Sequence, residues 1–160
     1  MAIQVGDSIP NLQLTQMTAD GLKPVATGDL FAGKKVALFA VPGAFTPTCT
    51  DTPLPGFLVQ ADKIKEKGAD LIVCTSVNDP FVMASWAKAT NAADHIQMLA
   101  DGNGDLAEAL DLVLDLSHIG LGKRSKRYAA IIDDGVVRYL GVEPAGDVGV
   151  SSADAVLEAL

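Results

Sequence analysis

The sequence predicts an α/β fold, a central mixed β-sheet flanked by helices, formed as a single domain over residues 1–160. Short apolar runs of strand length alternate with segments of helical periodicity, and this alternation is typical of the α/β class. Proline, glycine and Asp-Gly signals separate the segments. A chain of 160 residues is long enough to bury a hydrophobic core in one compact domain.

Each element follows from a local pattern. In chain order, the expected elements are strand 34–41 (KKVALFAV), helix 58–67, strand 70–77 (DLIVCTSV), helix 80–90, strand 96–100, helix 104–112, strands 128–133 and 136–142, and helix 151–160. The first two strands are continuous apolar runs, and Gly68 ends the first helix. Asn78 or Asp79 can cap the second helix, with Pro80 in its first turn.

The second half of the chain is marked by its turns. The Asp134–Gly135 pair between two strand-like runs is a strong signal for a β-hairpin. Ser151 and Asp154 have the spacing of a capping box, which places the start of the last helix. The whole order of elements is typical of an α/β sandwich of thioredoxin type. It does not determine the order of the strands in the sheet.

Composition and charge exclude several functions. The net charge is −8, whereas nucleic acids and acidic membranes bind basic surfaces, so we expect neither as a partner. Two cysteines are too few for a disulfide framework, a zinc site or an iron–sulfur cluster, and we expect no metal or other cofactor. The first twenty residues lack an apolar signal core and no apolar run reaches membrane-spanning length. We therefore expect a cytoplasmic protein.

Cys49 lies in the stretch VPGAFTPTCT (41–50), between a predicted buried strand and the next helix. In open α/β sheets, sites form where strands end and helices begin. Helical N–H groups favour an anion there, so this position should lower the pKa of the Cys49 thiol. Pro42 and Pro47 restrict the backbone, and the Thr46 hydroxyl is close enough to reach the sulfur. The same stretch also fits an inert buried cysteine, as most free cysteines are.

A reactive thiol has three possible uses, and each needs different partners. A cysteine hydrolase needs a histidine base, but the two histidines, His95 and His118, lie far along the chain in polar surroundings. A dithiol oxidoreductase needs Cys-x-x-Cys, but positions 46 and 52 are both threonine. Peroxide reduction needs a thiolate, a narrow slot for two oxygens, and donors to the departing oxygen. Thr46, backbone N–H groups and one arginine can supply these donors.

The segments PGAFTPTCT and LPGF (54–57) resemble the active-site segment of the type II, or atypical, peroxiredoxins, Pro-x-x-x-Thr-x-x-Cys. The resemblance continues through VNDPFVMASWAKA (77–89), LADGNGDLAEALDL (99–112), LGKRSKRYAAIIDDGVV (121–137) and VEPAGD (142–147). It therefore covers nearly the whole chain. It implies a thioredoxin-like fold and a thiol-dependent peroxidase that reduces hydrogen peroxide and alkyl hydroperoxides.

The resemblance also implies a role for four residues. Cys49 resembles the family's peroxidatic cysteine, which peroxide oxidises to a sulfenic acid. Thr46 resembles its hydroxyl partner, Pro42 the proline that shields the site, and Arg127 the arginine beside the sulfur. Thiols in solution then restore the cysteine, and family members use glutaredoxin, glutathione or thioredoxin for this step.

The residues around these four are interpreted more simply. Lys123, Arg124 and Lys126 share the segment KRSKRY with Arg127, and we expect them to be solvated surface charges. Gly43 and Phe45 are expected to shape the pocket.

Two departures from the family pattern bear on regeneration. Family members commonly have a histidine where this chain has Pro53. Some members place a resolving cysteine in the region equivalent to 142–152, where this chain has none. Cys74 is the only other thiol, and its spacing from Cys49 resembles that of two-cysteine plant and bacterial members. Because Cys74 lies within an apolar strand run, we also expect it to be buried. A Cys49–Cys74 disulfide and a one-cysteine route both stay open.

Two further expectations concern assembly and turnover. The resemblance implies a homodimer that forms near the active-site loop, with Phe45 and Leu54 exposed for contact with the partner. An alternative function is a redox sensor, in which Cys49 is oxidised once and signals without turnover. Both functions share the first oxidation step, and only the peroxidase sustains peroxide loss with an added thiol.

Overall fold

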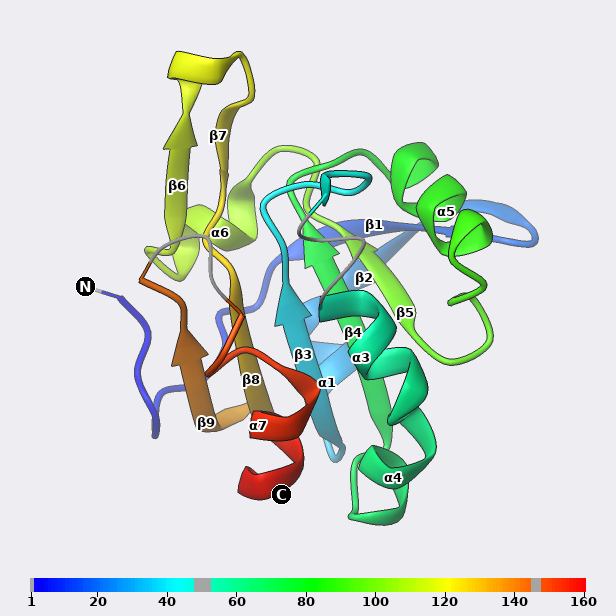
Figure 1. The fold of residues 1–160 in the computed structure, drawn as a ribbon, viewed down its shortest axis with the longest axis vertical. Helices are drawn as coiled ribbons and strands as arrows, with labels where there is room; N and C mark the ends of the chain where they lie inside the picture. The colour runs from blue at the N-terminus through cyan, green and yellow to red at the C-terminus, as the bar shows by residue number, and fades with distance from the viewer. Residues whose placement is uncertain (1, 48–52, 145–147) are drawn as a thin grey trace.

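The computed structural model describes residues 2–47, 53–144 and 148–160. Figure 1 shows the arrangement of its elements. In chain order they are β1 (Gln13–Thr18), β2 (Gly21–Ala26), α1 (Thr27–Phe31), β3 (Lys35–Ala40), α3 (Pro53–Val59), α4 (Ala61–Glu66), β4 (Leu71–Ser76), α5 (Pro80–Ala89), β5 (Gln97–Ala100), α6 (Asp105–Ala109), β6 (Val113–Leu116), the 3₁₀ turn η1 (Ser117–Ile119), β7 (Gly122–Ser125), β8 (Tyr128–Asp133), β9 (Val136–Val142) and α7 (Ala153–Ala159).

Within the described residues, seven strands form one mixed sheet in the order β2-β1-β5-β4-β3-β8-β9. The three central strands β3, β4 and β5 are parallel, while β8 pairs antiparallel with β3 and β1 pairs antiparallel with β5. The predicted mixed sheet is confirmed. Strands β6 and β7 form a separate antiparallel hairpin that stands away from the sheet at the top of Figure 1.

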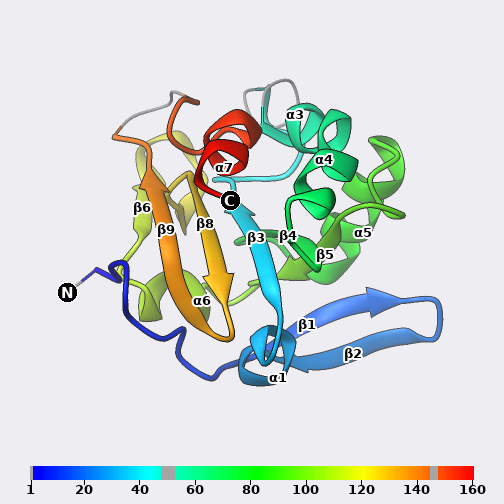
Figure 2. The same ribbon diagram turned by 90° about the horizontal axis from the view of Figure 1, so that it is seen from below.

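Helices cover both faces of the sheet, as Figure 2 shows. Residues of β3 alternate between two hydrophobic clusters. Ala37 and Phe39 pack in the cluster formed with α3, α4, α5 and α7, whereas Val36 and Leu38 pack in the cluster formed with α1 and α6. All four side chains are at most 1% exposed. A central parallel strand buried on both faces needs apolar residues at every position, which explains why KVALFA is a continuous run.

Most of the predicted elements are confirmed within a few residues. The five predicted strands correspond to β3, β4, β5, β8 and β9. The Oδ1 atom of Asp79 accepts a hydrogen bond from the Val82 N–H at 2.8 Å, and Pro80 opens α5, as expected. Asp134 and Gly135 have φ values of 50° and 80°, which is the left-handed backbone that a tight type I′ hairpin requires.

Two helices differ from their predictions. The helix expected over 58–67 is two helices, because Gln60 has non-helical dihedrals between α3 and α4. The last helix is capped by Ser152, whose side chain accepts from the Ala155 N–H at 3.1 Å, and not by Ser151. Ser151 is instead buried, and its hydroxyl donates a hydrogen bond to Glu143 at 2.6 Å. Because the Ser151 hydroxyl is bound to Glu143, the helix is capped one residue later than predicted.

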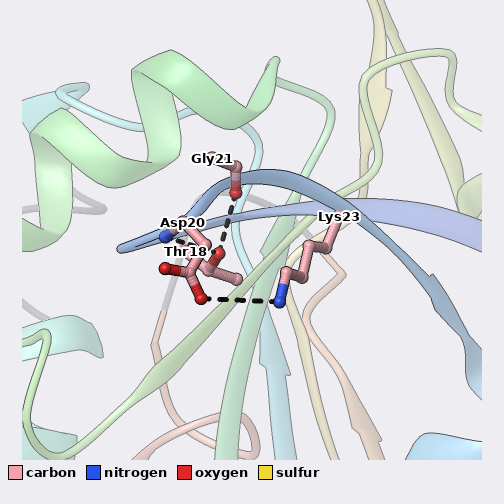
Figure 3. A network of polar contacts seen from close by, with 4 residues as sticks. All are labelled: Thr18, Asp20, Gly21 and Lys23. Atoms are coloured by element: carbon pink, nitrogen blue, oxygen red, sulfur yellow. Dashed lines mark hydrogen bonds and ion pairs between the residues drawn. The ribbon is translucent and has the colours of Figure 1, made fainter.

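The β1–β2 hairpin has no counterpart in the sequence analysis. Its strands are largely half-buried or exposed, and their sequences, QLTQMT and GLKPVA, contain no continuous apolar run that would predict a strand. Figure 3 shows the polar contacts at its turn: the Thr18 hydroxyl donates to the Gly21 carbonyl at 2.9 Å and accepts from the Asp20 N–H at 3.2 Å. Lys23 and Asp20 form an exposed ion pair at 3.7 Å, a kind of contact that adds little stability. Within β1 and β2 only Leu14 is buried.

None of the helices in the described parts of the chain is both long and apolar enough to cross a membrane.

A buried carboxylate connects the end of β9 to the start of α7. The Glu143 carboxylate accepts hydrogen bonds from the Gly149 N–H at 2.6 Å, the Ser151 N–H at 2.8 Å and the Ser151 hydroxyl. Burial alone raises the pKa of Glu143, but these hydrogen bonds and the nearby Arg127 charge outweigh it and lower the pKa below its ordinary value. The ionised carboxylate therefore stabilises this connection.

We expect Glu143→Gln to lower the melting temperature at neutral pH, because the amide loses the negative charge that accepts these bonds. A lowered folded-state pKa contributes stability above the ordinary glutamate pKa, and this stability is lost as the pH falls through the lowered value. The difference between the wild type and the variant should therefore shrink in acid. Thermal melts across pH measure it, with exposed Glu66→Gln as the control. A difference that is independent of pH would contradict this account.

Candidate active site

The loop that follows β3 lies across the ends of two parallel strands. The Val41 N–H donates to the Thr75 carbonyl at 3.2 Å, which extends the pairing of β3 and β4 by one residue. The Ala44 N–H then donates to Oδ1 of Asn78 at 2.9 Å, and the Ser76 hydroxyl donates to the same oxygen at 2.7 Å. The loop at 42–47 is thus fixed to the turn between β4 and α5, at the sheet edge where α/β sites form.

Thr46 has a defined hydroxyl orientation. Its Oγ1 donates to the Gly43 carbonyl at 2.8 Å. A hydroxyl has one hydrogen, so the Thr46 oxygen is left to accept hydrogen bonds from other groups. Between these two residues, Phe45 has a φ of 65°, a strained conformation for a large side chain. Such strain persists only where the surrounding contacts fix the backbone.

A cavity of about 580 Å³ lies between this loop, the β6–β7 hairpin and the segment after β9. Its lining includes three of the predicted site residues, Pro42, Thr46 and Arg127. The full lining is Pro42, Thr46, Pro47, Leu114, Leu116, Ile119, Leu121, Lys126, Arg127, Val142, Glu143 and Pro144. Most of these side chains are apolar, and the volume suits a small organic ligand. The cavity therefore combines an apolar wall with a few polar groups.

Arg127 is the buried cation of this cavity. It is 7% exposed and directly precedes β8, and its backbone carbonyl accepts from the Glu143 N–H at 2.9 Å. Its charge also helps to lower the pKa of Glu143. A buried arginine beside apolar residues presents its charge in a low-dielectric environment, where the charge acts strongly on a nearby anion.

The neighbouring basic residues are not all alike. Lys123 is exposed, as predicted. Lys126 lines the cavity and is half-buried. Arg124 is also half-buried, and its guanidinium donates to the backbone carbonyls of Leu121 and Val77. The prediction that Arg124 and Lys126 are simple surface charges is therefore wrong. The sequence contains no local signal for this, because Val77 lies 47 residues away from Arg124.

Cys49 lies outside the described residues, and its role stays a prediction. The described residues on either side are well placed: Pro47 lines the cavity and Pro53 opens α3. Helix α3 is fixed to the sheet by Phe57, whose ring stacks on Phe39 with centroids 4.1 Å apart and an interplanar angle of 5°. Proline is favoured in the first turn of a helix, so Pro53 in place of the family's histidine suits this helix start.

Three other expectations have clear outcomes. Cys74 is fully buried within β4 as predicted, paired with Phe39 of β3 and Met98 of β5. Leu54 is 0% exposed because it packs in the core beneath α3, so its predicted exposure is wrong. Neither Gly43 nor Phe45 lines the cavity: Phe45 is 54% exposed, and Gly43 acts on the lining only through its carbonyl, which accepts the Thr46 hydroxyl.

The described residues contain no group of three or more histidine, cysteine, aspartate or glutamate side chains that could hold a metal ion.

The comparisons with known proteins agree on one family. The Redoxin family model matches residues 4–157. Peroxiredoxin-2B of Arabidopsis thaliana is 47% identical over 99% of this chain and 98% of its own length, and peroxiredoxin-2C of rice (Oryza sativa) is 48% identical with the same coverage. The crystal structure of reduced Prx3 from Vibrio vulnificus in complex with hydrogen peroxide has a TM-score of 0.95 and 51% identity, and the match covers 98% of both chains.

These matches span almost the full chain at high identity, and the relatives are thiol peroxidases. Together with the mixed sheet and the cavity beside the loop at 42–47, they identify the chain as a member of the redoxin family and, within it, of the type II peroxiredoxins.

Proposed function

We propose that this protein reduces hydrogen peroxide and alkyl hydroperoxides through a sulfenic acid at Cys49. The observation that carries the proposal is the cavity that joins Pro42, Thr46 and Arg127. Pro47, which shares that lining, precedes Cys49 by two residues. The similarity to a Vibrio structure described with hydrogen peroxide supports the choice of substrate.

The groups around the cavity suit the chemistry of peroxide attack. The Thr46 oxygen can accept a hydrogen bond only from a group that carries a proton, such as the terminal O–H of a hydroperoxide. The Cys49 thiolate attacks the terminal oxygen, an S–O bond forms and the O–O bond breaks. The other oxygen leaves as an alkoxide or hydroxide, takes a proton from water, and departs as alcohol or water. The buried Arg127 charge stabilises both the thiolate and this departing oxygen.

The apolar wall of the cavity suits organic hydroperoxides as substrates in addition to hydrogen peroxide. The β6–β7 hairpin contributes Leu114, Leu116, Ile119 and Leu121 to the lining. An alkyl group that leaves water for this wall gains free energy in proportion to its buried area. A cavity for hydrogen peroxide alone would need neither this volume nor these side chains.

The central experiment measures sustained peroxide loss with glutathione and glutaredoxin, or with thioredoxin, as the thiol source. We expect the wild type to consume both hydrogen peroxide and cumene hydroperoxide over many turnovers, and Cys49→Ser to consume neither. Cys74→Ser is the matched control for loss of a thiol. Comparable turnover by Cys49→Ser would contradict the assignment of Cys49. A single stoichiometric oxidation that then stops, whichever reductant is added, would favour the redox-sensor alternative.

Regeneration by an external thiol fits the position of Cys74. This thiol is fully buried in the central strand β4, with a hydrogen-bonded strand on each side. A disulfide needs Cα atoms within about 7 Å and side chains that point toward each other. Its formation from β4 would require the strand or the Cys49 helix start to move. We therefore favour a mixed disulfide between Cys49 and glutathione or a partner thiol over an internal bond.

The mass of the intact protein after one equivalent of peroxide, without reductant, tests this route. We expect the addition of one oxygen atom, as sulfenic acid, or of more oxygen at Cys49. The Cys74→Ser variant should give the same addition. Rapid loss of two hydrogens with no added oxygen, abolished by Cys74→Ser, would instead establish a Cys49–Cys74 disulfide.

We also propose a homodimer that forms beside the active-site loop. Phe45 is an exposed aromatic residue with a strained backbone, in a loop connected through Asn78 to the start of α5. Near that start, Phe81 is 59% exposed. Exposed aromatic side chains are typical of interfaces that a partner covers. Sedimentation at micromolar concentration should give a dimer for the wild type and a monomer for Phe45→Glu.

Val59→Glu is the matched control, because Val59 is an equally apolar side chain that is 83% exposed on α3. A wild type that sediments only as a monomer would contradict the homodimer. A Phe45→Glu variant that stays dimeric would contradict the placement of Phe45 in the interface.

A further inference from the structure

The Arg124 side chain bridges two parts of the molecule that are distant in sequence. Arg124 lies in β7, and its Nε donates to the Leu121 carbonyl at 2.8 Å within the same hairpin. Its Nη1 donates to the Val77 carbonyl at 3.1 Å, in the turn that follows β4. The side chain therefore fastens the β6–β7 hairpin to the turn that also carries Asn78.

The same guanidinium packs against the active-site loop. A Cβ atom placed on Gly43 would lie 3.3 Å from Nη1 of Arg124 and 3.2 Å from Cγ2 of Thr46. Both distances are shorter than ordinary van der Waals contact. Glycine at position 43 thus allows Arg124 and Thr46 to approach the loop from two sides. The Gly43 carbonyl is also the acceptor that orients the Thr46 hydroxyl.

The loop needs such support because its backbone is strained at Phe45. Two groups hold it against the turn after β4. Asn78 accepts the Ala44 N–H at 2.9 Å, and Arg124 lies against Gly43 while bound to the neighbouring Val77 carbonyl. Loss of either contact would allow the turn between Gly43 and Thr46 to relax.

We propose that Arg124 is a positioning residue for peroxide reduction, which holds the turn at Gly43 so that the Thr46 oxygen faces the peroxide. This inference rests on the proposed function. Arg124 lies outside the lining of the cavity and acts through Gly43 and Thr46, whereas Arg127 lines the cavity itself. The planar guanidinium suits this role because it donates to two carbonyls in fixed directions, which a lysine ammonium on a flexible stem cannot reproduce in full.

The test compares two reactions of Cys49 in the same variants. Oxidation by hydrogen peroxide needs both the thiolate and a correctly placed Thr46, whereas alkylation by iodoacetamide needs only the thiolate. We expect Arg124→Met to slow oxidation by about 10-fold or more, since small misplacements of an aligning group are costly. The dependence of the alkylation rate on pH should stay that of the wild type. Arg124→Lys should recover part of the oxidation rate.

Two variants provide the controls. Lys123→Met removes an exposed cation from the adjacent position of β7 and should change neither reaction. Arg127→Met removes the buried cation of the cavity lining and should change both the oxidation rate and the pH profile of alkylation. An unchanged oxidation rate in Arg124→Met, or an equal fall in both reactions, would overturn the proposed role of Arg124. A wild type that does not react with peroxide would contradict the proposed function instead.

A second variant keeps the test valid if Arg124→Met does not fold, as circular dichroism and thermal melting would show. Gly43→Ala crowds both Arg124 and Thr46 without removing any hydrogen-bonding group. We expect it to slow oxidation by hydrogen peroxide while alkylation is preserved. Where both variants fold, the effects of Gly43→Ala and Arg124→Met on the oxidation rate should be non-additive, because the two residues are in contact. A wild-type oxidation rate in Gly43→Ala, or simple additivity of the two changes, would contradict the inference.

Discussion

The parallel pairing of β3 with β4 determines where everything else in the site lies. Both strands are buried on their two faces, so a slip in register would disrupt the close packing of both hydrophobic clusters. With the register fixed, the loop after β3 and the turn after β4 emerge side by side. One amide side chain, Asn78, then connects them through the Ala44 N–H. The loop at 42–47 is strained at Phe45, and its hydrogen bonds to the ends of the sheet strands hold it in that conformation.

The electrostatics of the site depend on burial more than on net charge. The chain has an overall charge of −8, yet the cavity contains a 7% exposed arginine among apolar side chains. Glu143, in the same lining, accepts hydrogen bonds from Gly149 and Ser151, and the nearby Arg127 charge helps to lower its pKa. Arg127 thus places a buried positive charge beside the cavity of an acidic protein, and a positive charge favours a thiolate and the anion released from a peroxide.

The sequence was a good guide wherever the structural cause was local. The cap at Asp79, the Asp134–Gly135 turn and the buried central strands all depend on neighbouring residues. Prediction from the sequence failed where the deciding contact is with a residue that is distant along the chain. The spacing of Ser151 to Asp154 predicts Ser151 as the cap, but the Ser151 hydroxyl binds Glu143 and Ser152 caps the helix instead. From the sequence alone, Arg124 resembles any other basic surface residue. Only the folded structure places the Val77 carbonyl beside its guanidinium. The β1–β2 hairpin has no apolar run to reveal it.

The β6–β7 hairpin gives the cavity two walls of different stiffness. The loop side rests on the seven-stranded sheet, whereas the hairpin is a separate two-stranded ladder that projects from the body of the protein (Figure 1). A short hairpin outside the main sheet belongs to the part of a fold that opens locally at low free-energy cost. The hydrogen bond from Arg124 to the Val77 carbonyl ties this hairpin to the turn after β4, and it therefore limits how far that wall can move and how large a molecule the cavity admits.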